Sequence, residues 1–155
     1  MIIDSTLEFA DAVSVAGSTG TNLIGSQVDT SVVRDIGQGQ PVYLVLTVAT
    51  TIVTGGVAGT IAFQLASDAA AAIATDGTQS IHFVTDTFVT DDTGEELQAG
   101  EVIGVYMLPA NMLHAYERYL GIQAVVATAA TTAGAINAFL TIDPYGWKAY
   151  ADATN

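Results

Sequence analysis

The sequence predicts an all-β protein, a sandwich or barrel of about eight strands. In several segments apolar and polar residues alternate with a period of two, and clusters of Gly, Asp, Asn and Thr separate these segments. Ala, Val, Thr, Gly and Ile dominate the composition, and much of that set favours strands and turns over helices. The 155 residues fit one domain, and 50% of them are hydrophobic, which is ample for a core.

The expected strands follow one another at the short intervals typical of such folds. In chain order they cover residues 7–15, 32–36, 41–51, 59–67, 81–90, 102–108, 119–127 and 135–142. The alternation is clearest in 59–67, where Ile61, Phe63 and Leu65 share one face. Residues 41–51 are largely apolar at odd and even positions, so we expect that strand to be buried on both faces.

The remaining segments predict connections. Residues 14–31 have few apolar anchors among many Gly, Ser and Thr, and we expect a long loop or extended arm near the N-terminus. The alanine-rich stretch 65–75 is compatible with a short helical turn or with a loop after the strand, because Ser67 and Asp68 suit either. A second short turn is expected at 109–113.

The chain is strongly acidic, with 3 Lys and Arg against 16 Asp and Glu and a net charge of −13. Its cations are Arg34, Arg118 and Lys148, too few for a basic patch on phosphates. We therefore expect no nucleic-acid binding, and repulsion disfavours an anionic membrane surface. The N-terminal segment carries Asp4 and Glu8 where a signal peptide has cations, and we expect a soluble protein.

The chain offers little catalytic chemistry. It has no cysteine, and His82 and His114 match no metal-binding motif, so we interpret both as surface or interface residues. No G-x-S-x-G elbow occurs, although a Ser-His-Asp triad stays open because its members need not be adjacent in sequence. The Gly-x-Gly at 37–39 precedes a strand and predicts a tight turn. We expect no enzyme, no catalytic residue and no cofactor.

A run of carboxylates lies between the strands expected at 81–90 and 102–108. Its members are Asp91, Asp92, Glu95 and Glu96. Clustered carboxylates are ligands for Ca²⁺, but the run does not match the EF-hand loop. We favour a solvated hairpin tip over a calcium site.

Three short segments, spread over the chain, carry a resemblance. They are Met1-Ile2-Ile3-Asp4 with Ser5, Leu7, Phe9 and Asp11-Ala12; Arg34-Asp35-Ile36-Gly37-Gln38-Gly39-Gln40-Pro41-Val42-Tyr43; and Glu117-Arg118-Tyr119-Leu120 followed by Ala138-Phe139-Leu140-Thr141. In this order they resemble the Bbp16-like family of phage capsid cement (decoration) proteins. The tail, with Tyr145 and Tyr150-Ala151-Asp152, resembles the aromatic C-terminus of that family, whereas the alanine-rich stretch departs from it.

The resemblance implies a jelly-roll-like β-sandwich that forms a homotrimer. It also implies binding to the major capsid protein on the outer surface of the phage head, with no catalytic residues, no direct contact with nucleic acid and no membrane partner. An alternative with the same fold is a head-fibre or tail-associated adhesion module that binds host glycan. A small carbohydrate-active enzyme is a third hypothesis.

Charged and aromatic residues are the candidates for an assembly interface. They are Arg34, Asp35, Glu117, Arg118, Tyr145, Trp147 and Tyr150. Cations are rare here, so each arginine is of interest. Arg34 is either paired with Asp35, and Arg118 with Glu117, of a neighbouring subunit, or each is held in an ordinary local salt bridge. The aromatic residues suit an anchor between subunits, packing on the chain's own core, or a carbohydrate platform.

Overall fold

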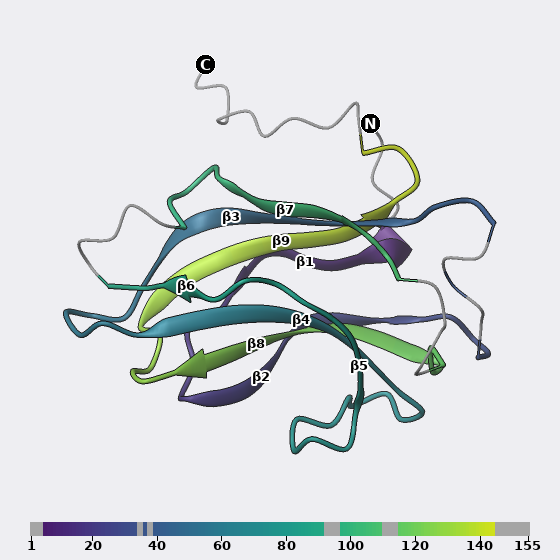
Figure 1. Ribbon diagram of the computed structural model, residues 1–155, viewed down its shortest axis with the longest axis horizontal. Helices are drawn as coiled ribbons and strands as arrows, with labels where there is room; N and C mark the ends of the chain where they lie inside the picture. The colour runs from purple at the N-terminus through teal and green to yellow at the C-terminus, as the bar shows by residue number, and fades with distance from the viewer. Residues whose placement is uncertain (1–4, 34–35, 37–38, 92–96, 110–114, 145–155) are drawn as a thin grey trace.

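The computed structural model describes residues 5–33, 36, 39–91, 97–109 and 115–144. Over these residues the protein is all-β, with two antiparallel sheets packed face to face (Figure 1). The elements are η1 Ser5–Leu7, β1 Glu8–Ser14, β2 Gly20–Asp29, β3 Tyr43–Val53, β4 Thr60–Asp68, β5 Ser80–Val84, β6 Phe88–Val89, β7 Val102–Met107, β8 Tyr119–Ala127 and β9 Ala133–Thr141. The prediction of an all-β sandwich is confirmed.

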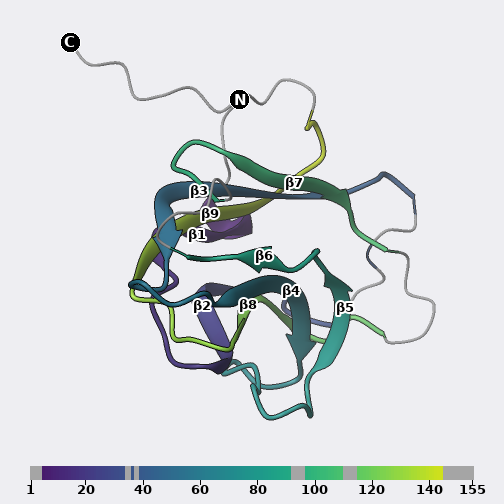
Figure 2. The ribbon, with the colours of Figure 1, turned by 60° about the vertical axis from the view of Figure 1, so that its left-hand side comes forward.

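Consecutive strands lie in different sheets along almost the whole chain. The first sheet has the order β1-β9-β3-β7 and the second the order β2-β8-β4-β5, with β6 also pairing with β4. β5 and β6 pair with opposite ends of β4, so they act as one interrupted edge strand. Counted together, they complete the strand order of an eight-stranded jelly roll. Figure 2 shows the first sheet above the second.

The core fills the space between the two sheets. Its largest fully buried apolar side chains are Phe9, Leu44, Leu46, Ile52, Ile61, Phe63, Leu65, Tyr116, Leu120, Ile122 and Ile136. Each fully buried Leu, Ile or Phe contributes about 1.5–3 kcal/mol relative to exposure. On β3 the other face is buried as well, at Val45 and Thr47, which confirms that expectation for 41–51.

The outer face of the second sheet is also buried where β4 pairs with β8. Gln64 and Gln123 lie opposite each other in the register, and the side-chain amide of Gln64 donates to Gln123 Oε1 at 2.7 Å. The Gln123 amide donates in turn to the carbonyl oxygen of Ala74, also at 2.7 Å. A Cβ on Gly121 would lie 2.7 Å from Ile73 Cδ1, so this isoleucine packs directly on the backbone of β8. The loop 69–79 therefore covers this face.

Of the two readings of the alanine-rich stretch, the loop is the one that forms, and residues 69–79 contain no helical turn. The carboxylate of Asp68, at the end of β4, accepts the backbone N–H groups of Ala70 and Ala74, each at 3.0 Å. These hydrogen bonds, that from Ala70 first, lower the pKa of Asp68. They hold the chain in a turn that leads back over the outer face of the second sheet. A helix starting at Asp68 would lead the chain away from this face.

Two expectations about strands are wrong. Residues 14–31 contain β2, which pairs with β8 from Gly20 to Asp29 instead of forming a loop or arm. The described part of 32–36 contains no strand, and Val32 and Val33 are exposed. In both places the partner strand decides the structure: β2 has β8 beside it, whereas no strand of the described residues pairs with Val32 and Val33. The turn expected at 109–113 lies, beyond Pro109, outside the described residues.

Residues 81–90 divide into β5 and β6 because the Thr85 side chain replaces a backbone carbonyl as a hydrogen-bond acceptor between them. The Thr85 hydroxyl oxygen accepts the Phe63 N–H at 3.0 Å, while the Thr85 N–H donates to the Phe63 carbonyl at 2.8 Å. The edge strand thus stays attached to β4 across the interruption.

Gly25 sets the distance between β1 and β2 at the opposite side of the sandwich. It has a positive φ of 66°, and a Cβ built on it would lie 2.0 Å from the Phe9 carbonyl oxygen. A side chain at this position would force the two backbones apart, since real Cβ atoms do not approach a carbonyl so closely. Closure of this side of the sandwich therefore requires glycine.

We predict that Gly25→Ala lowers the free energy of unfolding by at least about 2 kcal/mol, because it combines backbone strain with a clash against Phe9. Gly77→Ala is the matched control: Gly77 also has a positive φ, of 97°, but nothing lies within 4 Å of its Cβ position. Chemical denaturation monitored by circular dichroism measures both. Equal losses in the two variants would contradict the role of close strand approach.

Candidate functional site

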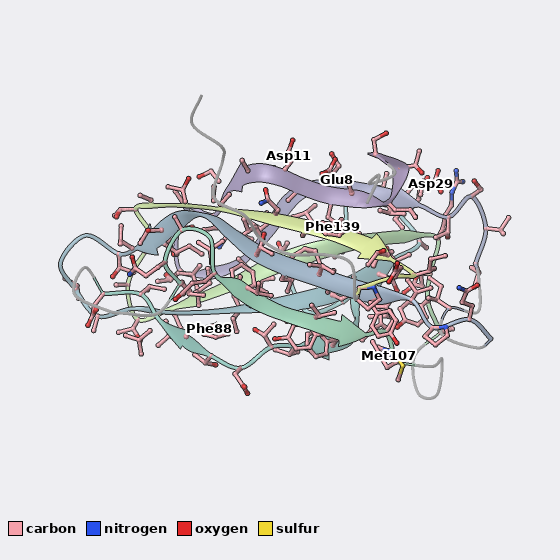
Figure 3. The ribbon with its side chains drawn as sticks, turned by 90° about the horizontal axis from the view of Figure 1, so that it is seen from above. Glu8, Asp11, Asp29, Phe88, Met107 and Phe139 are labelled. Carbon is pink, nitrogen blue, oxygen red and sulfur yellow. The ribbon has the colours of Figure 1, made fainter. Side chains whose placement is uncertain are left out.

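The two long sides of the sandwich differ in chemistry. Figure 3 shows Glu8, Asp11 and Asp29 along the side formed by β1 and β2, and Phe88 and Met107 along the opposite side. The β1–β2 side contains a groove of about 540 Å³, lined by residues of η1, β1 and β2 that include these three carboxylates. The groove is thus rich in hydrogen-bond acceptors and negative charge, a composition that suits a cationic or hydroxyl-bearing group on a partner.

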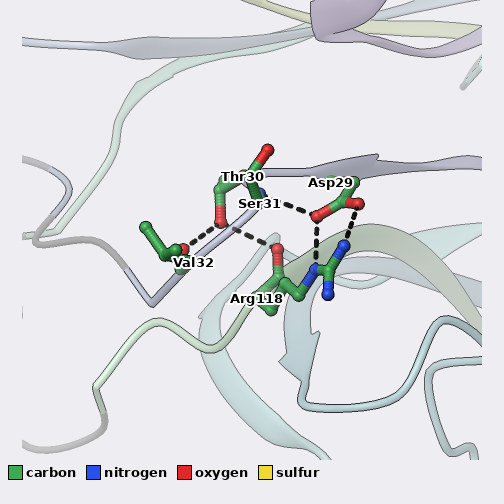
Figure 4. Close-up of polar contacts among 5 residues, drawn as sticks. All are labelled: Asp29, Thr30, Ser31, Val32 and Arg118. Carbon is green, nitrogen blue, oxygen red and sulfur yellow. Dashed lines mark hydrogen bonds and ion pairs between the residues drawn. The ribbon is translucent and has the colours of Figure 1, made fainter.

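At one end of this groove Arg118 forms an ion pair with Asp29 (Figure 4). The guanidinium donates from Nε to Asp29 Oδ1 and from Nη2 to Asp29 Oδ2, both at 2.8 Å. This bidentate geometry is the most specific that an arginine makes with a carboxylate. Arg118 also lies over the ring of Tyr119, with Cζ 4.9 Å from the ring centroid.

The backbone beside this ion pair is tied to the same residues. The Thr30 N–H donates to the Arg118 carbonyl at 3.0 Å, and the Ser31 N–H donates to Asp29 Oδ1 at 2.7 Å. The hydrogen bond from Arg118, followed by that from Ser31, lowers the pKa of Asp29 to about 2. Because this pKa lies below the ordinary value of 3.8, the stabilisation is present above pH 3.8 and is lost as the pH falls through about 2.

Two charged candidates for the assembly interface, Arg118 and Glu117, lie in the described residues, and they have different partners within the chain. Arg118 forms a local salt bridge, one of the two readings considered, and its partner within the chain is Asp29. The Glu117 carboxylate instead accepts the Ser80 hydroxyl at 2.9 Å. Sequence reasoning missed Asp29, which lies in a segment expected to be a loop. Whether Arg118 and Glu117 also contact a neighbouring subunit stays a prediction.

The other candidates for the assembly interface fall outside the described residues. They are Arg34, Asp35, Tyr145, Trp147 and Tyr150. The same applies to His114 and, among the carboxylates of the predicted hairpin tip, to Asp92, Glu95 and Glu96. Within the described ranges no group of three or more His, Asp or Glu side chains could hold a metal ion. No helix there is long and apolar enough to cross a membrane.

A serine and a histidine meet in the structure, at the buried end of β4. Ser67 Oγ lies 2.7 Å from His82 Nε2 and accepts the Glu117 N–H at 3.0 Å. The His82 ring stacks on Tyr116, with 3.9 Å between centroids. Ser67 is 0% exposed, so its oxygen is out of reach of a substrate. His82 joins β4, β5 and the segment before β8, and it is half-buried rather than a plain surface residue.

Comparison with known proteins gives one family. The family model described as Bbp16 matches residues 9–140, which is most of the chain and includes all nine strands except the first residue of β1 and the last of β9. No curated protein matches the sequence.

We predict that Arg118→Gln raises the pKa of Asp29 from about 2 toward 3.8, although not fully, because the Ser31 N–H remains. Carboxyl chemical shifts followed by NMR over an acid titration measure this value. Asp76, whose pKa is lowered by hydrogen bonds from Thr78, is the internal control and stays unchanged. An Asp29 pKa that remains about 2 in the variant would show that Arg118 does not set it.

Proposed function

The chain belongs to the Bbp16 family, and on that premise we propose that it is a cement protein of a tailed-phage capsid. In this role it binds the major capsid protein on the outer surface of the DNA-filled head, as a homotrimer, and stabilises the shell. It acts as a structural protein, without turnover and without a cofactor. The family match over residues 9–140 is the observation that carries the proposal.

The surface chemistry supports a protein that works by contact. The net charge of −13 keeps a particle coat soluble and disfavours direct contact with packaged DNA. The serine and histidine that meet in the structure are packed into the fold, with Ser67 wholly buried. A rigid two-layer sandwich, sealed on both faces of β3 and of the β4–β8 pair, is suited to transmit load between the proteins it joins.

The physical basis of cementing is multivalency. A trimer that contacts several capsid subunits at once converts each later contact into an intramolecular event at high effective concentration. Individually weak contacts then add to a strong hold. Cyclic symmetry of the trimer would match a three-fold position of the shell, so that every copy makes the same contact.

We predict that phage heads lacking this protein release their DNA at a lower temperature than complete heads. The reason is that contacts between neighbouring capsid subunits lose their external bridge. DNA release is measured by the fluorescence of an intercalating dye during heating. Adding the purified protein to deficient heads should restore the original release temperature, and bovine serum albumin at equal mass serves as the control.

The adhesion hypothesis gives a different result in the same particles. If the protein is a host-binding module, deficient particles keep their thermal resistance and lose adsorption to host cells. That outcome would overturn the cement proposal. Hydrolysis of a glycan by the purified protein would overturn both structural functions.

A further inference from the structure

One face of the sandwich is buried although no described strand lies over it. This is the outer face of the first sheet, which points away from the second sheet. Val45 of β3 and Phe139 of β9 lie opposite each other there and are only 0% and 2% exposed. Both lie outside the hydrophobic core between the sheets, to which Leu44 and Leu46 belong. The outer face of an antiparallel sheet is commonly solvated, so burial this complete requires a cover.

This surface, which we call the outer β3–β9 face, is mostly apolar, and its polar groups are paired. Its residues in the register are Tyr43, Val45 and Thr47 of β3, Asn137, Phe139 and Thr141 of β9, and Val105 and Met107 of β7. These three strands contain no Asp, Glu, Lys or Arg, and Glu8 of β1, opposite Phe139, lies at the border. The Asn137 amide donates to Thr47 Oγ1 at 3.2 Å, and Asn137 Oδ1 accepts the Ala12 N–H at 2.7 Å. Polar groups that are already hydrogen-bonded can be covered by an apolar partner.

We propose that the C-terminal segment of the same chain, residues 145–155, covers the outer β3–β9 face. β9 lies between β1 and β3 in the first sheet and ends at Thr141, shortly before Pro144, the last described residue. The segment therefore begins close to this face. Fully extended, it can span about 36 Å, whereas the nine residues of β9 span about 31 Å. It is long enough to run back along the whole of β9.

The composition of the segment fits an apolar surface without charge. It contains Tyr145, Trp147 and Tyr150, and aromatic side chains bury large apolar areas. Tyr145 and Trp147 are two positions apart, so in an extended chain both side chains point to the same side. Lys148 and Asp152 balance each other, so the acidic body of the molecule does not repel the segment as a whole.

Attachment favours the chain's own segment over that of a second copy. A tethered segment has a high effective concentration at a surface beside its point of attachment. A second copy, with the same net charge of −13, would be repelled as it approached. The proposal concerns a single chain and does not depend on the cement role, so its failure would leave that role untouched.

Trp147 reports directly on the cover, because it is the only tryptophan of the chain. Its fluorescence emission and its quenching by acrylamide are measured in the full-length protein. Phe139→Ala removes a contact on the outer β3–β9 face. Ile73→Ala is the matched control, because Ile73 is also buried, at 3% exposure, but packs on the outer face of the second sheet. Circular dichroism verifies that each variant is folded, and Val45→Ala is the milder variant if Phe139→Ala is not.

We expect the emission of Trp147 in the wild type to lie at shorter wavelength than in the denatured protein, with weaker acrylamide quenching. In Phe139→Ala both quantities should move toward their denatured values, because the indole ring loses a packing partner. Ile73→Ala should leave them unchanged. A wild-type emission equal to that of the denatured protein would overturn the proposal, and so would equal values in the two variants.

Engineered cysteines identify the segment that covers the face, because the chain contains no cysteine of its own. Val105→Cys, at a site 42% exposed and opposite Val45, is combined with Ala149→Cys in the segment. We expect a disulfide within one chain, seen as loss of free thiols at monomer mass on a non-reducing denaturing gel. In the control, Val57→Cys replaces Val105→Cys and forms no disulfide, because Val57, 61% exposed, lies in the turn between β3 and β4.

Three results would contradict the assignment. A disulfide between two chains would assign the cover to the segment of a neighbouring copy. A disulfide from Val105→Cys to Ile3→Cys, with none to Ala149→Cys, would assign it to residues 1–4. Absence of a disulfide in both pairs would show that neither segment lies on the outer β3–β9 face.

Discussion

The antiparallel pair formed by β4 and β8, buried on both faces, is the constraint on which the rest of the structure depends. Its inner face carries Phe63 and Ile122 into the core, while its outer face holds Gln64 and Gln123 out of water. Buried amides must find hydrogen-bond partners inside the protein, since each one left unsatisfied costs about 1–3 kcal/mol. The two glutamines meet each other, and the loop 69–79 supplies the remaining acceptor at Ala74. The loop is therefore part of the fold.

The other elements follow from this pair and from the jelly-roll connections. β2 extends the sheet beside β8, and the Arg118–Asp29 ion pair fastens the end of that pairing, where β2 leaves the sheet. β5 and β6 extend it beside β4, with Thr85 bridging their interruption. The first sheet then closes the core from the other side. The edge strands β7 and β5 of the two sheets come to lie together, where the Tyr106 and Phe83 rings meet.

Sequence patterns predict the strands whose own residues alternate between apolar and polar. They do not predict a strand that forms only because a neighbouring strand offers hydrogen-bond partners. The segments around β3, β4, β7, β8 and β9 were predicted nearly to their ends. β2 was missed because its Gly, Ser and Asn residues give no pattern, although β8 pairs with it from Gly20 to Ile24 and again at Val28 and Asp29. The opposite error arose at the β-branched Val32 and Val33, which have strand propensity but pair with no strand in the part of the chain that the structure describes. Arg118 and Asp29 lie 89 positions apart, and no local signal joins them.

The homotrimer that we propose can be held by charged residues or by apolar residues, and its response to salt distinguishes the two. Ion pairs at exposed arginines weaken as salt screens them, because the Debye length falls from about 10 Å at 0.1 M to about 3 Å at 1 M. An apolar contact between two acidic copies would behave in the opposite way, since salt screens their repulsion and leaves apolar burial intact. Arg118 is already bound to Asp29 of its own chain in bidentate geometry, so a new partner would first have to displace that carboxylate. In a sedimentation series from 0.1 M to 1 M sodium chloride, we therefore expect the association of the proposed trimer to strengthen, as for an apolar contact. Association that weakens would assign the contact to charged residues.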